Sequence, residues 1–137
     1  ICLPFMRRRS RIIQLASSAA FLPQPGFAVY AAGKSYVLSF SRALGEELRE
    51  KGIFVTAVCP GPVRTEFFER AERKASTLAI KKYVMADAKD VVRNALIASA
   101  RRRSVAVYSL PIQAFGLLTK LCPHSLILMI TRFLKRM

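Results

Sequence analysis

The sequence has few of the residues that build metal centres or disulfide frameworks. Its 137 residues include one histidine and three cysteines. Cys2, Cys59 and Cys122 are widely spaced, so they form neither a metal-ligand pattern nor a disulfide framework. His124 has no carboxylate or cysteine at ligand spacing. We therefore expect no metal site, a reduced cytoplasmic setting, and a buried hydrophobic role for Cys59.

A cluster of glycines is also missing. Proteins that bind dinucleotides cradle the pyrophosphate with glycines placed between the first strand and the first helix. The glycines of this chain stand singly, at Gly26, Gly33, Gly45, Gly52, Gly61 and Gly116. A phosphate loop of that kind, if the protein has one, is expected upstream of this chain.

Leader and membrane-spanning patterns are absent too. No charged-then-apolar segment with a small-residue cleavage site is visible. A spanning helix needs about 20 predominantly apolar residues, and the longest apolar run of the tail is only Leu126 to Ile130. Residues 111–137 read as two short helices broken at Pro123. We expect them to pack on the protein, with peripheral membrane contact as the alternative.

Acidic residues are scarce: eight Asp and Glu face 23 Lys and Arg, which gives a net charge of +15. Such a charge attracts nucleic acid, anionic lipid or phosphorylated cofactors without choosing among them. The arginines near the start, Arg7, Arg8, Arg9 and Arg11, have no interleaved aromatic residues. We therefore predict no specific nucleic-acid site.

The chain does contain an alternation of strands and helices. Short apolar runs at Ile12–Ala16 and Ile53–Val58 predict buried strands, and the residues from Ala28 to Lys51 predict one long helix between them. This order favours a parallel, right-handed crossover. A further helix is expected from about residue 86 with Asp87 as N-cap, followed by a strand over 104–110.

Ser17, Tyr30 and Lys34 form a candidate catalytic set. A spacing of four places Tyr30 and Lys34 on one helix face, and a nearby positive charge favours the phenolate form of a tyrosine. Ser17 follows a predicted strand, at the sheet edge where ligands of parallel sheets bind. Alternatively, Ser17 and Ser18 serve as turn or capping residues.

The full arrangement resembles the short-chain dehydrogenase/reductase family. Ser17 precedes Tyr30 by thirteen residues, Lys34 follows by four, and the segment Cys59-Pro60-Gly61-Pro62-Val63-Arg64-Thr65 follows the second strand. The resemblance implies an α/β fold with a doubly wound parallel sheet, a Rossmann fold of which only the C-terminal half is present. Residues 1–110 would form that half, and residues 111–137 a helical extension.

The resemblance also implies roles for the site residues. Tyr30 would exchange a proton with the substrate oxygen, Ser17 would hold that oxygen, and Lys34 would support Tyr30 and bind the nicotinamide ribose. The cofactor would be NADP or NAD, with NADP slightly favoured. The remaining cofactor-binding residues would lie in one segment, at Pro60, Gly61, Val63 and Thr65.

The substrate is expected to be a lipophilic carbonyl or alcohol. Phe21, Phe67 and Phe68 would line an apolar substrate wall, although they could equally pack beneath their own segments. The tail and the segment from residue 58 to 67 are similar to a branch that contains long-chain 3-oxoacyl reductases and hydroxysteroid dehydrogenases. The family resemblance also implies a homo-oligomer through the long helix. The alternative is a truncated, inactive fragment or a membrane-surface or interaction module.

Overall fold

The computed structural model describes residues 2–64 and 85–134. Three of the predicted site residues, Thr65, Phe67 and Phe68, lie outside this part. The described elements in chain order are a 3-10 turn at Leu3–Phe5, β1 (Arg11–Leu15), a second 3-10 turn at Ser18–Phe21, α1 (Ala28–Glu47), β2 (Phe54–Val58), α4 (Ala88–Ala100), β3 (Val105–Ala106), α5 (Leu110–Leu121) and α6 (His124–Leu134).

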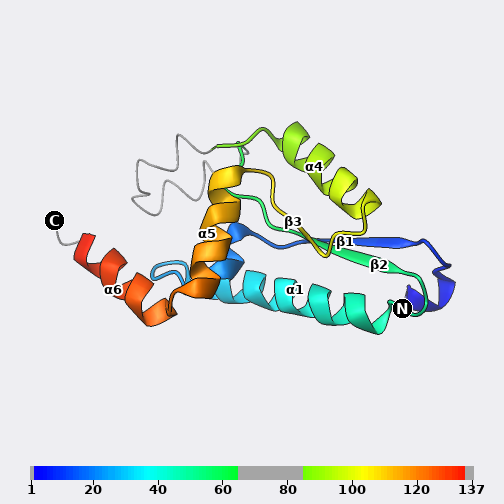
Figure 1. Cartoon of the computed structure of the whole chain (residues 1–137), viewed down its shortest axis with the longest axis horizontal. Helices are drawn as coiled ribbons and strands as arrows, with labels where there is room; N and C mark the ends of the chain where they lie inside the picture. Colours follow the sequence, from blue (N-terminus) through cyan, green and yellow to red (C-terminus); the bar gives the residue numbers. More distant parts are fainter. Residues whose placement is uncertain (1, 65–84, 135–137) are drawn as a thin grey trace.

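The three strands form a parallel sheet in the order β1-β2-β3. β1 pairs with β2 from Arg11 opposite Phe54 to Leu15 opposite Val58, and β2 pairs with β3 at Ala57 and Val105. Helix α1 connects the first pair and helix α4 the second. The two helices lie on opposite faces of the sheet (Figure 1). The predicted parallel crossover is therefore confirmed.

Side-chain alternation along β2 divides the core between the two faces. Ala57 and Cys59 point to the α1 side, where they pack with Leu38. Val58 points to the opposite side and packs with Ala95 of α4. This period of two is what a strand buried on both faces requires, and it explains why β2 is apolar except at Thr56, whose hydroxyl donates to the Arg103 carbonyl at 2.8 Å.

The long helix ends earlier than predicted. Helix α1 stops at Glu47 rather than near Lys51, and Leu48 closes it through its backbone N–H. The residues that follow turn back toward β2, with Gly52 at a φ of 67°. Glycine reaches that left-handed conformation without steric cost, so Gly52 can form the turn that leads from the end of α1 into β2.

The predicted strand over 104–110 is wrong in length. Only Val105 and Ala106 form β3, and α5 already begins at Leu110 with Ser109 as N-cap. Pro111 lies in the first helical turn, where its missing N–H costs nothing and its fixed φ favours the helix. The N-cap at Asp87 is confirmed, because its side chain accepts from the Lys89 N–H at 3.0 Å.

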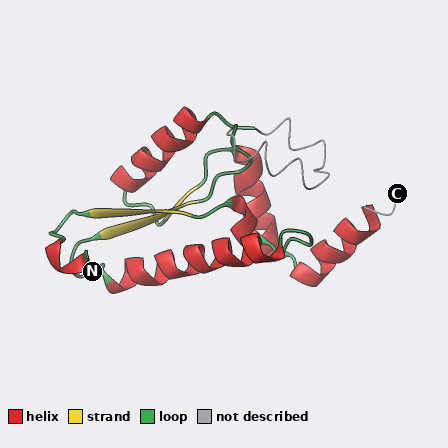
Figure 2. Cartoon of the chain, turned by 180° about the vertical axis from the view of Figure 1, so that it is seen from behind, coloured by secondary structure: helices red, strands yellow, loops and turns green. Residues whose placement is uncertain are grey.

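Helix α5 lies across the carboxyl ends of the strands, and α6 extends away from the rest of the described chain (Figures 1 and 2). The ring of Phe115 in α5 lies 6.5 Å from that of Phe21, measured between centroids. The break between α5 and α6 falls at Pro123, as predicted. None of the helices in the described part is long and apolar enough to cross a membrane.

Candidate active site

Ser17 stands directly beyond the carboxyl end of β1. Its Oγ accepts a hydrogen bond from the Ala19 N–H at 3.1 Å and so caps the short 3-10 turn that follows. This is the capping role that the sequence left open. The hydrogen bond from Ala19 uses one lone pair of the Ser17 oxygen and leaves the hydroxyl hydrogen available to donate. The side chain is half-buried. Ser17 can therefore cap the turn and still donate to a ligand oxygen.

Lys34 ties the long helix to the same end of β1. Its Nζ donates to the carbonyl oxygen of Leu15 at 2.8 Å, and it lies 5.7 Å from the centroid of the Tyr30 ring. Tyr30 is 36% exposed, so part of the residue is open to solvent. The Lys34 ammonium group thus stands beside Tyr30 and binds the carbonyl of Leu15, which lies two residues before Ser17 in the chain. The predicted set thus lies near the carboxyl end of β1, at the edge where ligands of parallel sheets usually bind.

The segment after β2 is fastened to the same edge. The Pro60 carbonyl accepts from the Ser18 N–H at 2.8 Å, which joins the loops that leave β1 and β2. Further along, Val63 forms a parallel bridge with Ala86. Pro60, Gly61 and Val63 are half-buried, and Pro60 is bonded to the serine loop, while Thr65 is outside the described residues.

Cys59 lies beneath this edge. Its side chain is fully buried, and this burial raises the pKa of the thiol to about 11. The charge of Arg42 and a hydrogen bond with the Ser17 backbone act in the opposite direction but are weaker. Cys59 therefore stays protonated at neutral pH. It packs as a small hydrophobic residue, as predicted, rather than acting as a nucleophile.

Phe21 lies against α5. Besides its contact with Phe115, it stands so close to Gly116 that a Cβ there would come within 3.0 Å of the ring. The ring thus makes the packing contact that the sequence offered as the alternative to a substrate wall. Helix α5 also covers Gly61, because Ile112 fills the space where a side chain at position 61 would lie.

The sequence model of the family described as short chain dehydrogenase matches residues 1–76, more than half of the chain. The chain belongs to the short chain dehydrogenase family. The match includes Ser17, Tyr30, Lys34 and the segment from Pro60 to Val63, so the residues gathered at the sheet edge lie within the family region. The Rossmann-like parallel sheet with helices on both faces agrees with this assignment.

Curated relatives of this short chain dehydrogenase include enzymes named for lipid substrates. Mouse 17-beta-hydroxysteroid dehydrogenase type 3 is 34% identical over 73 residues, which are 53% of this chain and 24% of the relative. Human very-long-chain 3-oxoacyl-CoA reductase is 41% identical over 68 residues, which are 48% of this chain and 22% of the relative. The matched stretches thus span less than a quarter of the length of these relatives.

Solved structures share the fold. A short-chain dehydrogenase from Sphingobium yanoikuyae in complex with NADPH is 32% identical with a TM-score of 0.62, and the match covers 73% of this chain and 37% of that protein. Other solved proteins with this fold were obtained with NADP or with NAD. The described part of this short chain dehydrogenase corresponds to only part of the neighbour's chain.

Two features of the edge could not be found by sequence reasoning. The bond from Lys34 to the Leu15 carbonyl involves a backbone atom, which carries no sequence signal. Arg42 and Lys120, which lie on α1 and α5, line one cavity together although they are far apart in the chain. Their spacing gives no hint of this neighbourhood, because the path of the chain after β3 decides it.

Proposed function

We propose that this chain carries the catalytic residues of an NAD(P)-dependent oxidoreductase that interconverts a carbonyl and an alcohol. The observation that carries the proposal is the position of Lys34. Its ammonium group is hydrogen-bonded at the end of β1 and at the same time stands 5.7 Å from the ring centroid of Tyr30. That position combines a proton-exchanging phenol, a cation and the Ser17 hydroxyl at one sheet edge.

Each of the three residues has a chemical task in the reducing direction. Ser17 donates its O–H to the carbonyl oxygen of the substrate and orients it. Tyr30 transfers its phenolic proton to that oxygen as the carbonyl carbon is reduced. The Lys34 charge stabilises the phenolate that remains, until a proton returns from solvent. In the oxidising direction, the same residues act in reverse.

The described residues fit one end of a nicotinamide cofactor, which when bound supplies or accepts the hydride. Lys34 would bind the ribose, and the half-buried segment with Pro60, Gly61 and Val63 would hold the carboxamide together with Thr65. The glycines of this chain form no pyrophosphate cradle. The choice between NADP and NAD is therefore made outside these residues, and family resemblance slightly favours NADP.

We propose further that this sequence is the C-terminal part of a longer enzyme. Within the described residues β1 pairs only with β2, so its other edge is open. On the face that Arg11 shares with α4, Ile13 is 38% and Leu15 is 69% exposed. An open edge with apolar side chains invites aggregation unless further chain covers it.

The alternative is that the fragment exists alone, as an inactive remnant or an interaction module. The intact mass of the native protein distinguishes a longer enzyme from such a fragment.

The substrate that we propose is lipophilic. This rests on the relatives named for steroids and very-long-chain acyl groups, and on the apolar α5 beside the sheet edge. Phe67 and Phe68 stay candidates for substrate contact.

Helix α6 exposes Leu126 and Met129 in a strongly basic chain, which supports peripheral contact of a cytoplasmic enzyme with anionic membranes. Co-sedimentation with phosphatidylserine vesicles tests this contact.

A homo-oligomer is proposed through α1. The helix exposes Tyr36 and Phe40, whose rings stack at 5.9 Å between centroids, and Val29 lies on the same side two turns earlier. Between them stand small exposed residues, including Ala32 and Gly33. Aromatic rings flanked by small residues suit close packing against a second helix.

The test of the catalytic proposal is Tyr30→Phe in the intact protein. This change removes one hydroxyl and keeps the ring beside Lys34. We expect the rate of NADPH or NADH oxidation with a panel of lipophilic ketones to fall by about 10²-fold or more, with cofactor binding retained. The matched control is Tyr108→Phe, since Tyr108 is similarly exposed and its hydroxyl donates to Asp90 on α4. Normal turnover in the Tyr30 variant would overturn the assignment.

A further inference from the structure

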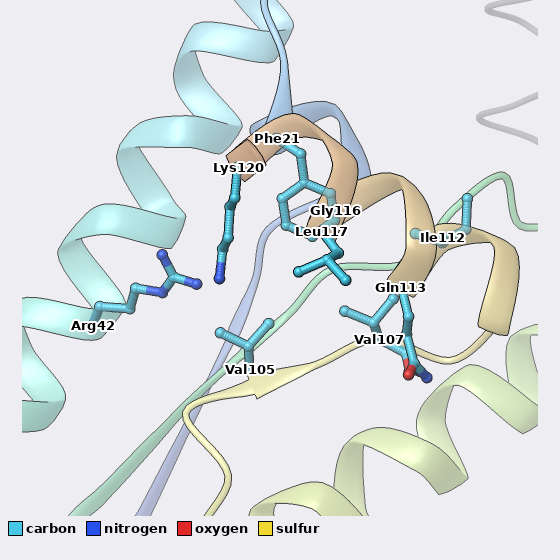
Figure 3. A pocket seen from close by; sticks show the side chains of 9 residues that line it. All are labelled: Phe21, Arg42, Val105, Val107, Ile112, Gln113, Gly116, Leu117 and Lys120. Carbon is cyan, nitrogen blue, oxygen red and sulfur yellow. Dashed lines mark hydrogen bonds between the residues drawn. The ribbon is translucent and has the colours of Figure 1, made fainter. Parts of the chain in front are cut away.

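A cavity separate from the serine-tyrosine-lysine set lies between α1, β3 and α5. It has a volume of about 260 Å³. Figure 3 shows its lining, which comes from segments far apart in the sequence. The walls are largely apolar, and the aliphatic and aromatic side chains that form them are Phe21, Val105, Val107, Ile112 and Leu117.

The uncharged polar residue of the wall, Gln113, makes one hydrogen bond within the protein. Gln113 donates from Nε2 to the carbonyl oxygen of Val107 at 3.1 Å, so its amide nitrogen is held against the wall. Phe21, Val105, Val107 and Ile112 are half-buried, and they form the inner part of the cavity. A ligand against this inner part would contact mainly hydrocarbon side chains, which favours an apolar group.

The charged end of the cavity is different. Arg42 and Lys120 both line it and both are exposed to solvent. Figure 3 shows their side chains extending toward each other from α1 and α5. Among the described residues, no acidic side chain forms an ion pair with either cation. The ion pair found there joins Arg49 to Glu46. Two like charges that converge repel each other, and an anion between them removes that repulsion.

We propose that this cavity binds an aliphatic carboxylate of medium chain length. The carboxylate would lie between the Arg42 guanidinium and the Lys120 ammonium, and the hydrocarbon chain would lie along Leu117 and Val105. The volume of about 260 Å³ and the largely apolar lining leave room for a short hydrocarbon chain beside the charged end. Octanoate is a suitable probe, because it combines such a chain with a carboxylate at one end.

The experiment is calorimetric titration of octanoate into the intact protein, with octanol and acetate as partial ligands. Octanol keeps the hydrocarbon without the charge, and acetate keeps the charge without the hydrocarbon. We expect octanoate to bind at one site and more tightly than either. Binding of acetate as tightly as octanoate would reveal an adventitious ion only, and failure of octanoate to bind would overturn the proposal.

Charge-removing variants locate the carboxylate. The double change Arg42→Gln and Lys120→Gln should weaken octanoate by about tenfold or more and leave octanol unchanged, because only the charged end is altered. Arg93→Gln on α4 is the matched control, since Arg93 is exposed on a helix away from the cavity. Unchanged octanoate binding in the double variant would overturn the proposal.

A second readout does not depend on any variant. Octanoate added to protein labelled at valine and leucine methyl groups should shift the resonances of Val105, Val107 and Leu117. Shifts confined to exposed leucines of α4 or α6 would contradict the cavity assignment. The proposal is independent of the catalytic one, because loss of turnover in Tyr30→Phe leaves octanoate binding in place.

Discussion

Cys59 illustrates how one residue reports on the packing around the site. It is enclosed between the α1 face of the sheet and the loop that carries Ser17, and it has no exposed surface. Burial penalises the thiolate more than the nearby Arg42 charge favours it, so the pKa of the thiol rises to about 11. The ionisation of this thiol therefore depends on whether the protein is folded, and the thiol is not a reactive group.

The raised pKa of Cys59 predicts a pH-dependent stability. The unfolded thiol has a pKa of 9.0, so above that pH the unfolded state loses its proton while the folded state keeps it. The contribution of Cys59 to the free energy of unfolding should therefore be unchanged below about pH 9 and fall by about 2 to 3 kcal/mol as the pH rises through about 11. Urea unfolding at a series of pH values measures this fall.

The matched variant for that measurement is Cys59→Ala. It lacks the titrating group, so its stability should decline less between pH 9 and 11 than that of the parent protein. The difference between the two curves isolates the thiol from the lysines and tyrosines that titrate nearby. Parallel curves would show that Cys59 ionises equally in the folded and unfolded states.

The candidate site was predictable from the sequence only where residue type and spacing carry the chemistry. The spacing of Tyr30 and Lys34 puts both on one helical turn, and the structure places the cation beside the ring. The capping bond of Ser17 was among the readings that the sequence left open. The convergence of Arg42 and Lys120 was not predictable, because it depends on how α5 crosses the strand ends.

At the scale of the elements, short apolar runs and helical spacing were sufficient to predict β1, β2, α1 and α4. Their ends were harder to predict. The turn at Gly52 and the early start of α5 at Leu110 both depend on backbone conformation at one or two residues. β3 is short because the chain leaves the sheet after Ala106 to enter α5, and its apolar composition does not record that departure.

The N-cap of α4 gives a prediction for one element. Asp87→Ala removes the carboxylate that accepts from the Lys89 N–H, so an amide at the helix start loses its partner. We expect the free energy of unfolding to fall by about 1 kcal/mol, as measured by urea unfolding. Asp87→Asn is the control, because its amide oxygen can still accept that bond. Equal losses in both variants would assign the effect to charge rather than to capping.

At the scale of the whole molecule, we propose that the exposed face of α1 governs assembly. Phe40→Glu places a charge where we propose that a second helix packs. The intact protein should then elute as a smaller species in size-exclusion chromatography with light scattering, with its circular dichroism unchanged. Leu121→Glu, at a position on α5 that is 73% exposed, is the control and should leave the mass unchanged. A parent protein that is already monomeric would refute assembly through α1.

Gly61 has a consequence for communication between the two sites. A Cβ at position 61 would stand 2.9 Å from the Cδ1 and Cγ1 atoms of Ile112, so the segment that we assign to the nicotinamide touches a side chain that also lines the cavity. The Ile112 side chain thus borders both the proposed nicotinamide segment and the cavity. If a ligand in the cavity rotates Ile112 and thereby changes cofactor affinity, thermodynamic linkage requires the cofactor to change the affinity of that ligand by the same factor.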